Sequence, residues 1–126
     1  MTKTVFAVRG AITVEANTKD EILNKTRFLL QELAQNNQIQ SEEEIISIFF
    51  TATSDLNACF PAKAARNLGW NNTALMCAQE IDVKGGLPRC IRVMIHYYSE
   101  NPNHKPHPVY LKEAHKLRPD IDNRSQ

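Results

Sequence analysis

The sequence predicts an α/β fold of the α+β kind, with a single mixed β-sheet and two main helices on one face. The prediction rests on segments rich in β-branched and aromatic residues, on two segments with helical signals, and on their order, β-α-β-α-β-β-β. The length of 126 residues suits one domain, residues 1–126, with a loose tail after about residue 120. A domain of this size buries roughly two-thirds of the surface that its unfolded chain exposes, so its core needs no disulfides.

The first strand and the first helix have distinct sequence signals. Residues 5–8 form an apolar strand that we expect to stop at residues 9–10, an Arg-Gly pair. A helix is expected from about Thr18 to Gln35, because apolar residues recur behind Thr18 at helical spacing. Thr18 and Glu21 predict a capping box, in which the Thr side chain accepts a backbone N–H bond while the Glu side chain reaches back. Asparagines at positions 36 and 37 are expected to end the helix.

The rest of the chain contains one short helix and four strands. The helix is expected between a proline at its start and Gly69 just after its end, the positions at which these residues are favoured. The strands are β-branched or aromatic, and turns are expected at residues 85–86, 101–108 and 117–120. In chain order, the elements are a strand at Ile45–Thr53, the helix at Pro61–Leu68, and strands at Thr73–Ala78, Cys90–Ser99 and His107–Leu111.

The strand at Cys90–Ser99 carries large side chains on both of its faces. Isoleucine, valine and tyrosine at the odd positions from Ile91 to Tyr97 alternate with Arg92, Met94, His96 and Tyr98. Because the helices are expected to cover one face of the sheet only, the other face would lie in water. We therefore expect this face to pack against sister subunits.

Composition and charge limit the partners of the chain. Fifteen Lys and Arg residues balance fourteen Asp and Glu residues, and this net charge of +1 argues against a general nucleic-acid binder. No apolar run is long enough to span a membrane, and the N-terminus does not resemble a signal peptide. The three cysteines form no Cys-x-x-Cys pair and predict reduced thiols in a cytoplasmic protein.

Several charged residues are candidates for an anion-binding site. Arg9 follows an apolar strand, Lys63 and Arg66 share one face of the short helix, and Arg92 lies inside an otherwise apolar strand. An arginine cannot lose its proton to avoid burial, so Arg92 requires water, a structural carboxylate or an anionic ligand. These alternatives stay open on spacing alone.

Other candidate groups have equally open roles. Glu80 could be a general base, a hydrogen-bond acceptor or a solvated surface acid. Cys77 could be a nucleophile, although no histidine is near it in sequence to activate it. His104 and His107 have metal-ligand types, but a proline-rich loop does not align their rings, so we predict no metal site.

Several segments, in order from about residue 5 to residue 121, match the pattern of one known family. The segments are Arg9–Glu15, Asp55–Arg66, Cys77–Val83, Gly85–Leu87, Cys90–Met94, Val109–Leu111 and Leu117–Asp120. Together they resemble the corresponding segments of AroH-type chorismate mutases. The resemblance implies a homotrimer in which the sheets pack around a barrel-like core, helices lie outside, and active sites lie between adjacent subunits. It also implies an isomerase that rearranges chorismate, a dianion, to prephenate in aromatic amino acid biosynthesis without a cofactor.

The resemblance further implies roles for individual residues. Arg92 would place its guanidinium on the ether oxygen and a carboxylate of chorismate, while Arg9 and Tyr110 would bind carboxylates. Glu80, helped by Cys77, would accept a hydrogen bond from the ring hydroxyl. The remaining residues expected at the cleft are Phe60, Ala62, Lys63, Arg66 and Met76, with Leu117 and Arg118 closing it.

The sequence departs from the family pattern at three places, and two other functions are compatible with parts of it. Met76 stands where a smaller, often hydroxylated residue is expected, the turn before Trp70 is one residue short, and the tail after Asp120 is brief. A non-catalytic trimer that binds a small carboxylate would not need Glu80 and Arg92 together. An imine deaminase of the RidA-like kind uses an arginine for a carboxylate but lacks the segments from Phe60 to Arg66 and from Cys77 to Glu80.

Overall fold

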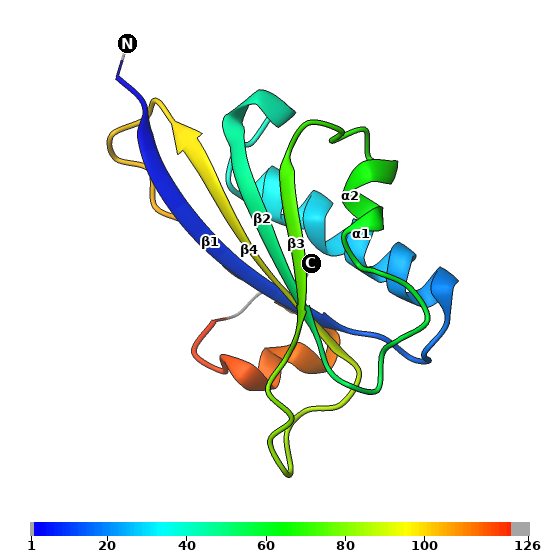
Figure 1. Cartoon of the computed structure of the whole chain (residues 1–126). Coiled ribbons are helices and arrows are strands. Elements are labelled where there is room, and N and C mark those ends of the chain that lie inside the picture. Colours follow the sequence, from blue (N-terminus) through cyan, green and yellow to red (C-terminus); the bar gives the residue numbers. More distant parts are fainter. Residues whose placement is uncertain (1, 122–126) are drawn as a thin grey trace.

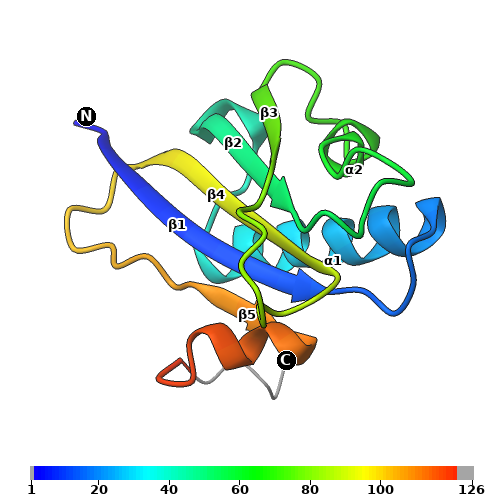
Figure 2. The ribbon, with the colours of Figure 1, turned by 60° about the horizontal axis from the view of Figure 1, so that its bottom comes forward.

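A computed structural model describes residues 2–121, and it contains one five-stranded sheet with the strand order β3-β2-β4-β1-β5 (Figures 1 and 2). The strands are β1 (Thr4–Thr13), β2 (Ile45–Ala52), β3 (Ala74–Gln79), β4 (Cys90–Ser99) and β5 (Val109–Leu111). The α-helices are α1 (Lys19–Asn36) and α2 (Lys63–Asn67), and the 3₁₀-helices are η1 (Glu42–Glu44) and η2 (Lys112–Leu117).

The sheet is mixed, as predicted. The central strand β4 runs antiparallel to β1 and β2, whereas β3 is parallel to β2 and β5 is parallel to β1. Each parallel pair therefore adds one edge strand to an antiparallel centre. The five predicted strands all exist. β4 has the predicted bounds, the ends of β2, β3 and β5 differ from the prediction by at most two residues, and β1 continues to Thr13.

The main core lies between the sheet and the two α-helices. Leu29, Leu30 and Leu33 of α1 are fully buried against β-strand residues such as Phe50 and Ile95, which are also fully buried. Burial of one such side chain stabilises a fold by about 1.5–3 kcal/mol. Since buried alanines of α2 belong to the same core, α1 and α2 cover one face of the sheet, which confirms the prediction.

The strand β1 continues through Gly10, so the predicted stop at residues 9–10 is wrong. A Cβ atom on Gly10 would lie 2.8 Å from the carbonyl oxygen of Val109 and 2.9 Å from a methyl group of Leu33. Gly10 is needed because β5 and α1 approach the backbone closely there, which is one of the positional uses of glycine in strands. The glycine marks a packing contact and not the end of the strand.

The predicted capping box at the start of α1 is only half formed. The Thr18 hydroxyl accepts a hydrogen bond from the N–H of Glu21 at 3.1 Å. The Glu21 carboxylate accepts from the N–H of Glu15 at 2.8 Å and not from the backbone of Thr18. The helix ends at Asn36, as predicted, and Asn37 caps it by donating to the carbonyl of Leu33 at 2.8 Å.

The helix η2 lies on the face of the sheet opposite α1 and α2, where only a turn near its end was predicted. Its Ala114 packs with Ala11, Cys90 and Tyr110 in a small buried cluster separate from the main core. The N–H of Glu113 donates to the hydroxyl of Thr13 at 3.0 Å and fastens η2 to β1. The sequence lacks helical periodicity over these residues, so the element was missed. The tail beyond Ile121, including any lid role for it, lies outside the described residues.

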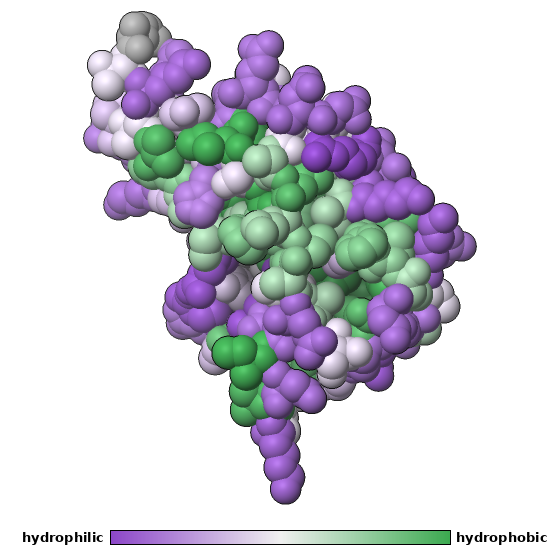
Figure 3. Space-filling model, in the orientation of Figure 1, coloured by the Kyte–Doolittle hydropathy of each residue, from purple (hydrophilic) through white to green (hydrophobic). Residues whose placement is uncertain are grey.

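The remainder of this second face, which we name the open face, carries no helix. Side chains alternate between the two faces along each strand. Because Val8 and Phe50 are buried against the helices, their sequence neighbours Arg9 and Phe49 point to the open face. Val5, Phe49, Met76 and Tyr98 are exposed there, and Met76 retains 61% of its accessible surface. Figure 3 shows apolar side chains gathered across the strands within a polar border.

Candidate active site

The strand register brings four of the predicted site residues onto or next to the open face. Arg92 of β4 lies opposite Ala11 of β1, and Ala11 in turn lies opposite Tyr110 of β5. Arg9 lies two residues before Ala11 on the same side of β1, so it is a diagonal neighbour of Arg92. The pairing of these strands thus places two guanidinium groups and a phenol in one area.

Glu80 completes this group from the end of β3. Its carboxylate lies 3.4 Å from Nε of Arg92 and accepts a hydrogen bond from the Thr51 hydroxyl at 2.7 Å. The backbone N–H of Glu80 donates to the carbonyl of Ala52 at 2.9 Å, which extends the β2–β3 pairing by one residue. The side chain of Arg92 is 45% exposed and that of Glu80 is 26% exposed, so both can reach a ligand.

Buried groups support the Arg92 end of the site. Cys90, two residues before Arg92, is 1% exposed, and burial raises the pKa of its thiol to about 11 although Arg92 opposes the shift. Leu117 packs against the cluster that contains Cys90 and Tyr110. Arg118 forms an ion pair with Asp120 at 2.8 Å, which raises the pKa of Arg118, and Tyr110 adds to that shift from nearby.

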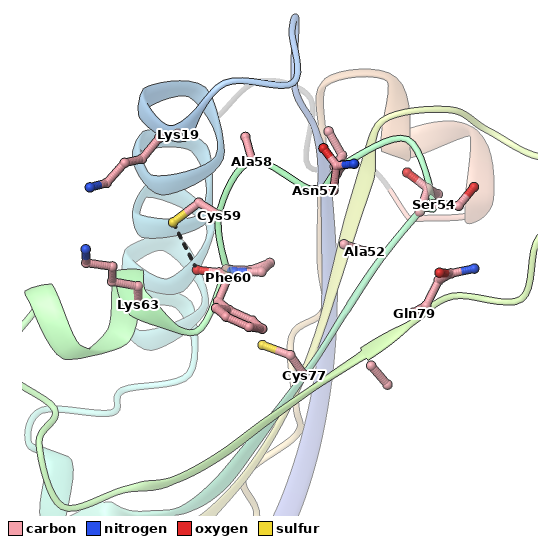
Figure 4. A pocket seen from close by; sticks show the side chains of 14 residues that line it. Lys19, Ala52, Ser54, Asn57, Ala58, Cys59, Phe60, Lys63, Cys77 and Gln79 are labelled. Atoms are coloured by element: carbon pink, nitrogen blue, oxygen red, sulfur yellow. Dashed lines mark hydrogen bonds between the residues drawn. The ribbon is translucent and has the colours of Figure 1, made fainter.

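A second group of predicted residues lines a cleft of about 610 Å³ between β2, β3, α2 and the loop before α2 (Figure 4). Phe60, Lys63 and Cys77 all line it, and Phe60 is 75% exposed. Burial raises the pKa of Cys77, although the backbone of Ala62 opposes the shift. Because the thiolate is the reactive form, a raised pKa disfavours Cys77 as a nucleophile.

The two groups of residues do not meet within one chain. Cys77 lies opposite Phe50 in the register and packs against the main core, whereas Glu80 contacts Thr51 on the open face. Met76 is likewise on the open face, away from the cleft residues. Arg66 does not line the cleft, and its guanidinium donates to the carbonyl of Trp70 at 2.6 Å.

His104, one of the two histidines considered as metal ligands, lies apart from the group around Arg92. His104 is buried and its Nε2 lies 2.5 Å from the Tyr97 hydroxyl, far along β4 from Arg92. Among residues 2–121, no three His, Cys, Asp or Glu side chains come close enough to hold a metal ion. In the same part of the chain, no helix has the length and apolarity that crossing a membrane requires.

Known proteins match nearly the whole chain. The family model for chorismate mutase type I matches residues 5–121. The chain belongs to the chorismate mutase type I family. The chorismate mutase AroH of Thermus thermophilus is 44% identical over 119 residues, which cover 94% of this chain and 98% of the relative. The chorismate mutase AroH of Bacillus subtilis (strain 168) is 44% identical over 118 residues, which cover 93% of this chain and 92% of the relative.

A solved chorismate mutase structure from Clostridium thermocellum superposes with a TM-score of 0.84 at 53% identity, covering 89% of this chain and 98% of that chain. These matches confirm the predicted fold class and the predicted assignment to the isomerases of the chorismate mutase kind.

Within this chorismate mutase fold, Thr51 and Thr53 support the group around Arg92, and neither was predicted from the sequence. Thr51 positions Glu80, and the hydroxyl of Thr53 accepts from the N–H of Cys90 at 3.0 Å. Alternation along β2 places Thr51 on the same face as Phe49, and this was the available signal. It was not sufficient, because the pairing of β2 with both β3 and β4 has to be known first.

Proposed function

We propose that this chain converts chorismate to prephenate by a one-step rearrangement, in which an ether C–O bond breaks as a C–C bond forms. No proton is transferred and no nucleophile attacks. The enzyme has to select the folded conformer of the substrate and stabilise the charge that develops on the ether oxygen. The observation that carries the proposal is the Arg92–Glu80 ion pair beside Arg9 and Tyr110.

In the proposed complex, Arg92 donates to the ether oxygen and to one carboxylate of the substrate. Its position beside Glu80 supports this role, because the carboxylate contacts the guanidinium at Nε and not at its two terminal nitrogens. Glu80 accepts from the ring hydroxyl, and its bond from Thr51 keeps the carboxylate oriented. Arg9 and Tyr110 bind the carboxylates.

We propose further that the working form is a homotrimer with active sites between adjacent subunits. One protomer would supply Arg9, Glu80, Arg92 and Tyr110, and its neighbour would supply Phe60, Lys63 and Cys77. Two observations support the proposal. One group of residues lies on or next to the open face and the other on the helix side of the sheet, and the open face exposes large apolar side chains. Contiguous exposed apolar surface of this kind marks interaction sites.

The proposed reaction uses no cofactor, and a cytoplasmic location is part of the same proposal. All three cysteines are free thiols, as is usual for proteins in a reducing compartment. The substituents of chorismate, two carboxylates and a hydroxyl, match a cage of cations and hydrogen-bonding groups better than they match a nucleophile or a metal.

The decisive experiment follows the ultraviolet absorbance of chorismate mixed with the purified protein. We expect the absorbance to fall and prephenate to accumulate at the same rate with or without EDTA. A protein that leaves chorismate unchanged would overturn the proposed function. Turnover that depends on added zinc would overturn the cofactor-free mechanism and would favour a zinc site formed by the histidines.

A further inference from the structure

The cleft shown in Figure 4 contains a cation that the mechanism above does not use. Of the fourteen described residues that line the cleft, two are lysines, Lys19 and Lys63, and none is acidic. Lys63 is the first residue of α2 and Lys19 is the first residue of α1. In Figure 4 both amino groups extend on the same side of the cleft, on either side of Cys59.

The position of Lys19 in its helix is unfavourable for a cation. The N-terminus of a helix carries a partial positive charge, so acidic residues are favoured in the first turn and basic residues are disfavoured. Asp20 and Glu21 follow this rule and Lys19 breaks it. Among the ion pairs that the structure describes, none includes Lys19, so no described carboxylate offsets its unfavourable place in the helix.

We propose that Lys19 is a substrate-capture residue, which draws the dianionic substrate into the cleft together with Lys63. The inference rests on the proposed function, because only an anionic substrate would gain from this field. An exposed ammonium group on a flexible stem acts as a hydrated point charge, so its effect is long-ranged and weakened by salt. Lys19 therefore raises kcat/KM through substrate association and leaves the rearrangement step, and hence kcat, unchanged.

The test compares Lys19→Glu and Lys19→Gln with Lys105→Glu, which makes the same change in net charge in the loop between β4 and β5. Lys105 does not line the cleft, so Lys105→Glu is the matched control. We expect Lys19→Glu to lower kcat/KM about fivefold at an ionic strength of about 20 mM, with little difference left at about 500 mM. Lys19→Gln should show a smaller loss, and Lys105→Glu should resemble the wild type at both salt concentrations.

Thermal unfolding provides an independent readout. Because a glutamate suits the first turn of a helix, Lys19→Glu should unfold at the same temperature as the wild type or above it. A structural role for Lys19 would instead lower the unfolding temperature and the activity together.

Three outcomes would overturn the inference while the proposed function stands: an unchanged kcat/KM at low salt, a loss that persists at high salt, or a fall in kcat. A wild-type protein without activity on chorismate would overturn both.

Discussion

At the scale of single residues, the position of the Arg92 side chain depends on the groups around it. Its side chain is almost half exposed, so the ion pair with Glu80 stabilises the fold by no more than about 1 kcal/mol. What fixes the guanidinium is the rigid strand below it, with buried Cys90 two residues away and Glu80 held in turn by Thr51. A charged donor supported in this way loses little energy to reorganisation when charge develops on a bound ligand.

Replacement of Arg92 by alanine should remove the main electrostatic stabilisation of the transition state. We expect Arg92→Ala to lower kcat by about 100- to 1,000-fold or more, equivalent to roughly 3–4 kcal/mol. Steady-state chorismate assays measure the loss, and Arg27→Ala, an exposed arginine on α1, is the matched control. Cys77→Ser should be much less impaired than Arg92→Ala. Equal inactivation of the two variants would point to covalent chemistry at Cys77 and contradict the proposed mechanism.

Thr51 is expected to act through Glu80 as a positioning residue. Thr51→Val keeps the shape of the side chain but removes the 2.7 Å hydrogen bond to the carboxylate, and we expect kcat to fall about tenfold. Thr51→Ser restores the hydroxyl and should recover most of the activity. If serine and valine variants were equally impaired with unchanged unfolding temperatures, the hydroxyl would have no part in orienting Glu80.

The residues of the site were predictable to different extents. The resemblance of several segments to one family predicted Arg9, Glu80, Arg92 and Tyr110 as site residues. Their arrangement was not predictable, because it depends on which strands are neighbours, and β1 and β4 are distant in sequence but adjacent in the sheet. The sequence therefore identified which residues could bind the substrate, and the strand register showed how these residues are arranged.

At the scale of elements, the loop between β4 and β5 is fastened to the end of α1 by a buried polar network. The Tyr97 hydroxyl contacts His104 and donates to the side chain of Asn37 at 3.2 Å, and Asn37 accepts from the N–H of His107 at 2.8 Å. The ring of Phe6 packs edge-on against His104 at 4.9 Å. Burial raises the pKa of Tyr97 to about 12 and, with His107 nearby, lowers the pKa of His104.

This network makes the fold sensitive to acid. Since the folded state lowers the pKa of His104, the unfolded chain binds a proton more readily as the pH falls below the ordinary histidine value of about 6.5. The contribution of His104 to stability is thus fully present above that pH and decreases below it, by at most about 1.4 kcal/mol per pH unit. Urea unfolding at pH values between about 8 and 5, the range in which histidine titrates, measures this contribution to stability.

The control for the acid effect is His104→Gln, which cannot take up a proton there. We expect this variant to be less stable than the wild type at neutral pH and to show a weaker pH dependence. An identical dependence in the two proteins would assign the effect to another titrating group.

Element types were more predictable than element ends. The apolar periodicity identified α1, and β-branched residues identified β2 and β4, because these elements bury one face each. The sequence predicted a strand end at Gly10 because the packing partners of this glycine, Val109 and Leu33, lie far away in sequence. η2 was missed for a similar reason: its contacts with β1 and β5 are tertiary and leave no periodic pattern.

At the scale of the whole molecule, the sequence predicted the open face of the sheet. Within a single protomer, no helix of the described residues covers this face. Alternation in β4 predicted large side chains on both faces, and exposed Tyr98 of β4 confirms this. Phe49 of β2 and Met76 of β3 are exposed on the same face. Which surfaces meet in an assembly depends on complementary shapes that a single sequence does not display.

Mixing two impaired variants tests the proposal that each site is shared between two protomers. Arg92→Ala and Lys63→Glu should each be strongly impaired alone, because every site then lacks one of its halves. When they are unfolded together and refolded in equal amounts, sites that pair an intact Arg92 with an intact Lys63 should restore about a quarter of the wild-type activity. Chorismate turnover and light scattering, which should report a trimer, measure the outcome. Recovery of no activity from a correctly assembled mixture would contradict a site shared between protomers.

The burial of Cys90 beneath η2 also makes this thiol a natural reporter of motion near the site. With 1% of its surface accessible and a pKa of about 11, Cys90 is closed to an alkylating reagent until η2 lifts from the sheet. Cys59 and Cys77 are partly accessible and have no such cover. The slowest of the three thiols to be alkylated thus times the opening of the segment that lies over Tyr110.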